Sequence, residues 1–196
     1  MHKLRKSSVV SSLPLFLVFV SYKPLRLCVT IAIMNTITNF NLKTFSSEQT
    51  KQVAFQLASL LQPNDALLLT GDLGAGKTQF TQGLAAGLEI SAEVTSPTFT
   101  IMCVYENATL PLYHFDLYRL EDETELEDIG FYEMVEADGV SCIEWGDKFP
   151  EEMPEDLLII NITVGLDEVR SIEVSAQGDR AHLLMQQWQE KVHDYK

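Results

Sequence analysis

Cysteine is scarce in this sequence, and its distribution excludes a disulfide framework. The chain has 196 residues and three cysteines, Cys28, Cys103 and Cys142. They are too few and too scattered for the bridges that hold small secreted domains together, and no pair has the short spacing of a metal site. This pattern indicates a reducing, intracellular compartment, and we expect the protein in the cytoplasm.

Basic side chains are also scarce, which argues against direct binding of nucleic acid. The formal net charge is -14, and residues 1–34 hold five of the 14 Lys and Arg but none of the 28 Asp and Glu. The rest of the chain therefore carries nine basic and 28 acidic side chains, and such a body repels phosphate backbones. If the protein serves a nucleic-acid pathway, we expect it to act through another protein.

The sequence also lacks an apolar run long enough for a comfortable membrane span. Residues 1–34 contain only a short apolar run. MHKLRK followed by VVSSLPLFLVFV resembles the start of a secretory signal, but the run is short and broken by proline. Three interpretations remain open: a start codon placed too far upstream, with Met34 opening the normal protein; an acid-free, Ser-rich targeting peptide; or a real signal or anchor. We expect an extension outside the fold, a domain over residues 35–196 and no membrane contact.

The remaining sequence shows no internal repeat, linker or second core, which predicts one α/β domain. Ser46 and Gln49 are spaced as in a capping box at the start of a helix. The run ALLLT at 66–70 is typical of a buried parallel strand. A glycine-rich loop and a helix from about Lys77 follow, so strand, loop and helix stand in the order that phosphate binding requires.

Later segments predict further strands and a closing helix. TFTIMCVYENA and LPLYHFDLYRL are strand-like stretches on either side of a polar turn, and GVSCIEWGD is a buried-strand pattern that ends on an acid. DLLIINITVGLDEVRSIEVSA alternates around residues 165–167, which predicts a late antiparallel hairpin. The spacing of Leu183, Leu184 and Trp188 predicts a C-terminal helix. The expected sheet is mainly parallel apart from the hairpin.

The pattern Gly71-x-x-x-x-Gly76-Lys77-Thr78 predicts a nucleotide site with Mg²⁺. Glycines let the backbone turn tightly, so that N–H groups and a helix N-terminus point at phosphates. The Lys77 ammonium contacts the phosphates, and the Thr78 hydroxyl completes the Mg²⁺ shell. Because the guanine-reading pattern Asn-Lys-x-Asp is absent, we expect ATP. The binding candidates are Gly74, Ala75, Gly76, Lys77, Thr78 and Gln79.

A phosphate-loop enzyme also needs a carboxylate at the end of a neighbouring strand, to hold Mg²⁺ or the attacking water. Asp116 in YHFDLYR and Glu144 at the end of VSCIE both fit. For each alone, an exposed strand acid is an equally good interpretation. We therefore predict Lys77, Asp116 and Glu144 as catalytic residues, and Thr78, Asp116 and Glu144 as metal ligands.

Four further features have both a structural and a functional interpretation. His114 could be a base, although a structural or partner-facing role is favoured. Trp145 could belong to the core, cover the nucleotide or dock a partner. Arg119 could pair with an acid or a phosphate. The stretch SPTF at 96–99 is either a nucleotide-sensing loop or a simple turn.

The motifs GDLGAGKTQF, SPTFT, HFDLYRL, IEWGD and MPEDLLIINI occur in this order within residues 40–176. In combination they resemble the bacterial TsaE (YjeE) family, the ATPase of the tRNA threonylcarbamoyladenosine pathway. The resemblance implies a small three-layer α/β P-loop domain that binds ATP and Mg²⁺. It also implies TsaD and TsaB as partners, which install threonylcarbamoyl on adenosine 37 of tRNAs that read codons beginning with A. The resemblance further implies that ATP hydrolysis is weak without the partner complex. In that family, hydrolysis resets the complex between turnovers.

The resemblance also implies roles for individual residues. Carried over by motif, Lys77 and Thr78 hold phosphate and Mg²⁺, Asp116 and Glu144 complete the metal site, and Trp145 matters for activity. In DEVRSIEV, the arginine matches a family position near the nucleotide; this is Arg170. Two departures from the family are Gln79, where a second Thr is common, and the N-terminal extension.

Three functions are compatible with these features. The first is a partner-coupled ATPase of tRNA modification, favoured by the ordered motifs and the acidic body. The second is a small-molecule kinase, which usually closes an Arg-rich lid over the phosphate. Against it, the arginines after Met34 are only Arg119, Arg170 and Arg180. The third is a nucleotide sensor that does not catalyse hydrolysis. Against it, all three predicted metal ligands, Thr78, Asp116 and Glu144, are present.

Overall fold

The computed structural model describes residues 39–106 and 110–193. The three interpretations of residues 1–34 concern a segment outside these residues. Within the described part of the chain, every helix is too short or too polar to cross a membrane.

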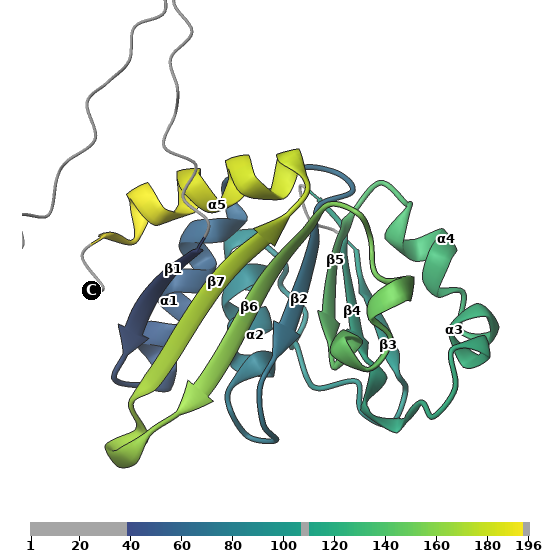
Figure 1. The fold of residues 1–196 in the computed structure, drawn as a ribbon, viewed down its shortest axis with the longest axis horizontal. Coiled ribbons are helices and arrows are strands. Elements are labelled where there is room, and N and C mark those ends of the chain that lie inside the picture. Colours follow the sequence, from purple (N-terminus) through teal and green to yellow (C-terminus); the bar gives the residue numbers. More distant parts are fainter. Residues whose placement is uncertain (1–38, 107–109, 194–196) are drawn as a thin grey trace, which may run out of the picture. The chain divides into compact units, whose positions relative to one another are not determined.

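One seven-stranded sheet lies at the centre of the described chain (Figure 1). In spatial order its strands are β1 (Asn39–Thr44), β7 (Arg170–Gln177), β6 (Leu157–Val164), β2 (Ala66–Thr70), β5 (Val140–Glu144), β4 (Leu112–Asp116) and β3 (Met102–Tyr105).

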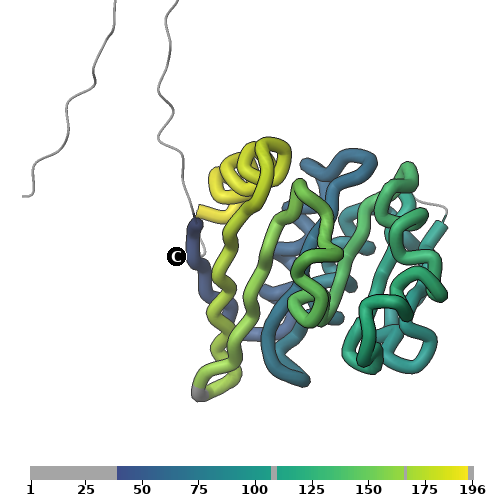
Figure 2. Tube along the Cα trace, turned by 45° about the vertical axis from the view of Figure 1, so that its right-hand side comes forward, coloured from purple at the N-terminus to yellow at the C-terminus, as the bar shows by residue number. Residues whose placement is uncertain are grey.

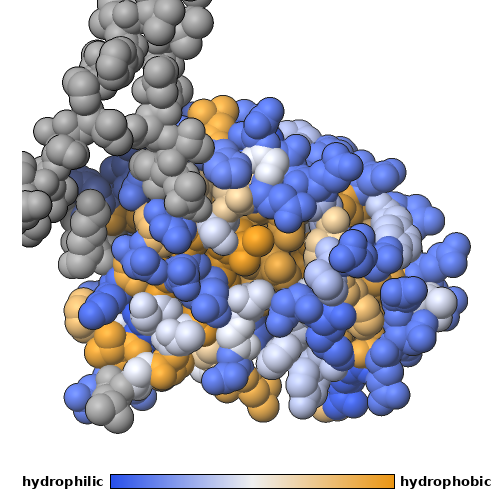
Figure 3. Space-filling view, in the orientation of Figure 1, coloured by the Kyte–Doolittle hydropathy of each residue, from blue (hydrophilic) through white to orange (hydrophobic). Residues whose placement is uncertain are grey.

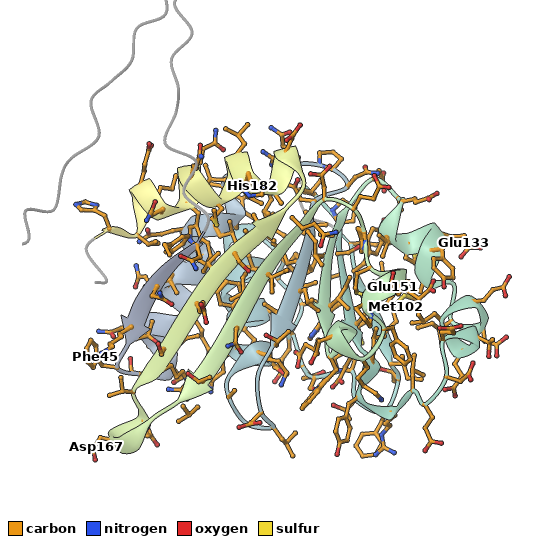
Figure 4. All side chains as sticks on the ribbon, viewed as in Figure 1. Phe45, Met102, Glu133, Glu151, Asp167 and His182 are labelled. Atoms are coloured by element: carbon orange, nitrogen blue, oxygen red, sulfur yellow. The ribbon has the colours of Figure 1, made fainter. Side chains whose placement is uncertain are left out.

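The sheet is mixed rather than mainly parallel. The four strands β6, β2, β5 and β4 are parallel, whereas β7 pairs antiparallel with β6 and β1, and β3 pairs antiparallel with β4. Three of the six pairings are thus antiparallel. The predicted late hairpin is confirmed as β6 and β7, joined through the 3-10 segment η4 (Leu166–Glu168), with Asp167 at its tip (Figure 4).

Helices pack on both faces of the sheet, as Figures 1 and 2 show. One face packs against α1 (Ser47–Ala58), α2 (Lys77–Gly87) and α5 (Asp179–Lys191). The elements on the other face, over β2, β5 and β4, are α3 (Thr124–Asp128), α4 (Phe131–Val135), η1 (Leu117–Arg119), η2 (Gly146–Lys148) and η3 (Pro150–Glu152). The surface over α3 and α4 is largely hydrophilic (Figure 3), in line with the acidic composition of this stretch.

The continuous apolar run of β2 is explained by burial on both faces. Leu67 and Leu69 belong to the core under α1, α2 and α5, whereas Ala66 and Leu68 belong to the core on the other side. Both cores therefore fix the position of the strand that leads into the glycine-rich loop.

The predicted C-terminal helix is confirmed as α5, which buries one side against the core. Leu184 and Trp188 are buried, whereas Leu183 is 47% exposed. Ala181 and Met185 complete the buried face instead, because positions three and four apart share one side of a helix. The indole Nε1 of Trp188 donates to the Val53 carbonyl at 3.0 Å, which ties α5 to α1.

Candidate functional site

A pocket of about 280 Å³ lies where β2, β4 and β5 end. Parallel strands bring their carboxyl ends to one edge of a sheet, and Asp116 of β4 is the register partner of Glu144 of β5. The pocket is lined by Leu73, Gly74, Gly76, Lys77, Thr78, Gln79, Ser96, Thr98, Asp116, Glu144 and Trp145. All the residues predicted for the site are in this set except Ala75 and Arg170, which lie beside it.

The glycine-rich loop (residues 71–78) takes a shape that requires glycine at two positions. At Gly71 φ is +127°, and an added Cβ would lie 2.1 Å from the carbonyl oxygen of Ile162 on β6. At Gly76 φ is +112°, and Arg170 Nε would be 3.1 Å from the added atom. The loop is therefore pressed against the β6–β7 hairpin.

Replacing Gly71 by alanine should lower the free energy of unfolding by about 2–5 kcal/mol, because the methyl group meets a backbone carbonyl and the φ is strained for other residues. Urea unfolding followed by tryptophan fluorescence measures the loss. Gly165→Ala is the matched control, since its nearest neighbour would be 3.5 Å away, an ordinary contact. Equal losses in the two variants would contradict this account.

Arg170 supports the loop from behind and does not line the pocket. Its Nε donates to the Ala75 carbonyl at 3.3 Å, and its Nη1 donates to the Glu168 carbonyl at 3.1 Å. The side chain is almost fully buried, so its charge lies beneath the backbone of the loop. Arg170 therefore lies against the glycine-rich loop through the Ala75 carbonyl, and its closeness to a nucleotide stays a prediction.

Lys77 is held at the first turn of α2 by neutral acceptors. Its Nζ donates to the carbonyls of Gly71 at 2.8 Å and Asp72 at 3.1 Å, and lies 4.2 Å from the centre of the Trp145 ring. Burial lowers the pKa of the Lys77 ammonium below its usual value of 10.5, while Glu144 and other nearby carboxylates act in the opposite direction. The site therefore holds a partly desolvated cation beside an aromatic face.

Glu144 is the acid that contacts the loop motif directly. Its Oε1 accepts a hydrogen bond from Thr78 Oγ1 at 3.1 Å and lies 2.9 Å from His114 Nε2. The side chain is 4% exposed. A hydroxyl and a carboxylate are thereby adjacent at the start of α2.

Asp116 is engaged mainly with the 96–98 segment. Its Oδ2 accepts from Ser96 Oγ at 3.1 Å and from Thr98 Oγ1, and its Oδ1 accepts from the backbone N–H of Tyr118 at 3.1 Å. Its neighbours Phe115 and Leu117 belong to the core, whereas Asp116 lines the pocket. The carboxylate thus ties the loop before β3 to the end of β4.

The structure decides between some of the alternatives for the other residues. His114 is fully buried, so a partner-facing role is excluded. Trp145 lines the pocket with its ring close to Lys77. Arg119 lies over the Phe99 ring, 4.4 Å from its centre, and enters none of the ion pairs found among the described residues. Ser96 and Thr98 belong to the SPTF stretch, but nothing in the sequence indicates their bonds to Asp116.

A magnesium ion fits the chemistry of this donor set. A hydroxyl, a carboxylate and water are the oxygen ligands that Mg²⁺ prefers, usually with only one or two carboxylates from the protein. Within residues 39–106 and 110–193, no cluster of three His, Cys, Asp or Glu side chains is arranged to enclose a metal by itself. The pair Thr78 and Glu144 suits an ion that also has water and phosphate ligands.

Together, the fold and the pocket define an α/β protein in which a central strand of one mixed sheet leads through a glycine-rich Lys-Thr loop into a helix. The family model described as "Threonylcarbamoyl adenosine biosynthesis protein TsaE" matches residues 44–172. The chain belongs to the TsaE family, which confirms the resemblance seen in its motifs.

Individual relatives agree with this assignment. A Bacillus subtilis protein named tRNA threonylcarbamoyladenosine biosynthesis protein TsaE is 44% identical over 145 residues, 74% of this chain and 90% of the relative. A Treponema pallidum protein of the same name is 42% identical over 130 residues, 66% of this chain and 96% of the relative. The crystal structure of YdiB from Bacillus subtilis matches with a TM-score of 0.69 at 37% identity, over 80% of this chain and 96% of that one.

Proposed function

We propose that this chain binds ATP with Mg²⁺ and hydrolyses it for the TsaB–TsaD complex, which modifies adenosine 37 in tRNAs that read codons beginning with A. The observation that carries the proposal is the pocket in which the loop lysine, the Thr78 hydroxyl and the Glu144 carboxylate meet. The names of the relatives supply the pathway.

The loop and Lys77 would bind the phosphates. The backbone N–H groups at the start of α2 carry the positive end of the helix dipole, and Arg170 adds a charge beneath them. Lys77 Nζ would exchange its carbonyl acceptors, Gly71 and Asp72, for phosphate oxygens. That exchange replaces neutral acceptors by anionic ones, which adds direct Coulomb attraction between the ammonium and the phosphates in a partly desolvated site.

Thr78 and Glu144 would hold Mg²⁺, with Glu144 also able to hold one of its waters. When bound, the ion supplies positive charge against the β- and γ-phosphate oxygens. Asp116 would contribute through water, because both of its oxygens already accept hydrogen bonds from the protein. Trp145 would exclude water from the side of the pocket where Lys77 lies.

The surface around the pocket supports a protein partner rather than tRNA. Leu73 is 79% exposed and Phe99 85% exposed, and Tyr118 nearby is 49% exposed. Large exposed apolar side chains that gather around a site commonly mark contacts with another protein. The acidic charge of the body, in contrast, opposes a direct grip on tRNA phosphates.

The placement of the arginines argues against a small-molecule kinase. Arg119 stacks over Phe99, and Arg170 lies behind the loop. Arg180 forms an ion pair with Asp65, a residue just before β2, at the end of the sheet away from the pocket. None of these three arginines therefore lines the pocket as a lid over a transferred phosphate would.

The proposal is tested by the rate of ATP hydrolysis with and without purified TsaB–TsaD. We expect slow turnover by the isolated chain and at least about a tenfold increase with the complex, which corresponds to about 1.4 kcal/mol of activation free energy. Labelled γ-phosphate should appear as inorganic phosphate. Transfer of the label to a metabolite, or a rate that ignores the complex, would contradict the proposal.

A further inference from the structure

His114 lies in the interior of the sheet, directly behind Glu144, one of the two acids that line the pocket. It lies in the middle of β4 and is fully buried, with Cys103 of β3 and Cys142 of β5 as its register partners. Its Nε2 is 2.9 Å from Glu144 Oε1. It does not line the pocket, so it touches neither a bound nucleotide nor a partner protein.

The surroundings of His114 fix which ring nitrogen carries the proton. Nε2 faces a carboxylate oxygen, which can only accept a hydrogen bond when ionised, so Nε2 is the N–H donor. The other nitrogen, Nδ1, is buried and has no hydrogen-bond partner among the described atoms. Burying an unpaired polar atom costs about 1–3 kcal/mol, and an apolar side chain would avoid that cost. Packing alone therefore gives no reason for a histidine here.

We propose that His114 is a positioning residue that holds the Glu144 carboxylate in its working orientation, an inference that rests on the proposed hydrolysis of ATP. Oε1 receives two hydrogen bonds, from His114 Nε2 on the sheet side and from Thr78 Oγ1 on the loop side. No described residue donates to the other oxygen, Oε2. The two donors thus fix the carboxylate by one oxygen and leave Oε2 for the metal ion or its water.

The proposal predicts which substitutions of His114 are tolerated, because the donor to Glu144 must lie at the place of Nε2. Glutamine ends in an amide nitrogen at about the place of Nε2, whereas the amide of asparagine reaches only the place of Nδ1. His114→Gln should therefore keep the hydrogen bond to Glu144, and His114→Asn should lose it. Loss of a partner that orients a metal-binding carboxylate typically costs about 10- to 100-fold in activity.

The experiment compares these two variants with the wild-type chain in the presence of TsaB–TsaD. We expect kcat for ATP hydrolysis to fall about 10- to 100-fold in His114→Asn and to stay within about threefold in His114→Gln. The Kd for ATP should change little in either variant, because the loop and Lys77 are untouched. His182→Asn, on α5 away from the pocket (Figure 4), controls for loss of a histidine and should behave as wild type.

The melting temperatures of the two variants separate positioning from a general structural role. Equal kcat values in the two variants, whether both normal or both reduced, would overturn the inference. A loss of kcat in His114→Asn that follows its melting temperature, with Kd weakened in parallel, would overturn it as well. If the wild-type chain does not hydrolyse ATP with the complex, the proposed function itself fails, and this inference fails with it.

Discussion

Lys77→Ala should remove most of the proposed ATPase activity: we expect kcat for ATP hydrolysis to fall about 100- to 1000-fold, the usual cost of removing one donor that stabilises a transition state. ATP affinity should fall as well, since each hydrogen bond to a charged group is worth about 1.5–3 kcal/mol. Among the described residues that line the pocket, Lys77 is the one cation, and Arg170 cannot replace it because its side chain lies behind the loop.

The measurements are steady-state hydrolysis with TsaB–TsaD and ATP binding by calorimetry, alongside tRNA modification in cells that lack the native copy. Lys43→Ala is the matched control, because Lys43 is an exposed residue of the edge strand β1. A Lys77→Ala chain that still supports modification in those cells would refute the proposed ATPase function.

Glu144→Gln should separate binding from hydrolysis. The amide has the shape of the carboxylate, and its oxygen can still accept from His114 and Thr78, so we expect the fold and the Kd for ATP to change little. The negative charge is lost, however, and with it the group that would hold Mg²⁺ or orient water. Removing such a group typically costs about 10²- to 10⁴-fold in rate.

The comparison needs hydrolysis, ATP affinity and modification in cells for the same variant. Glu173→Gln on the exposed face of β7 removes an equal charge away from the pocket and should leave all three unchanged. If Glu144→Gln binds ATP and fails in modification, hydrolysis is required. If it supports modification normally, nucleotide sensing is sufficient and the catalytic role is wrong.

The candidate site could be located from the sequence because its main residues belong to short, contiguous motifs. The glycine-rich loop is contiguous, and its context of strand and helix is confirmed by β2 and α2. Asp116 and Glu144 could be placed together because the ends of parallel strands meet at one edge. Their chemical roles remain predictions, since shared lining of a pocket does not demonstrate catalysis.

Other features depend on strand order, which the sequence does not encode locally. The bond between His114 and Glu144 requires β4 and β5 to be neighbours, and the support of Ala75 by Arg170 joins residues 95 positions apart. The antiparallel β3 and the mixed character of the sheet likewise follow from tertiary packing. The spacing of Leu183, Leu184 and Trp188 predicts the helix but not which leucine is buried, because two adjacent leucines leave the rotation of the helix ambiguous by one position.

Because the β6–β7 hairpin supports the glycine-rich loop, the loop can take its final shape only after that hairpin is present. Thr70 bonds Asn161, Gly71 fits against Ile162, and Arg170 holds Ala75, so the loop is supported by two strands that are synthesised well after it. A nascent chain that has emerged only to residue 150 already contains the glycine-rich loop, Asp116 and Glu144. It still lacks β6 and β7, the strands against which the loop packs. Competence to bind nucleotide should therefore arise late in folding, together with completion of the sheet.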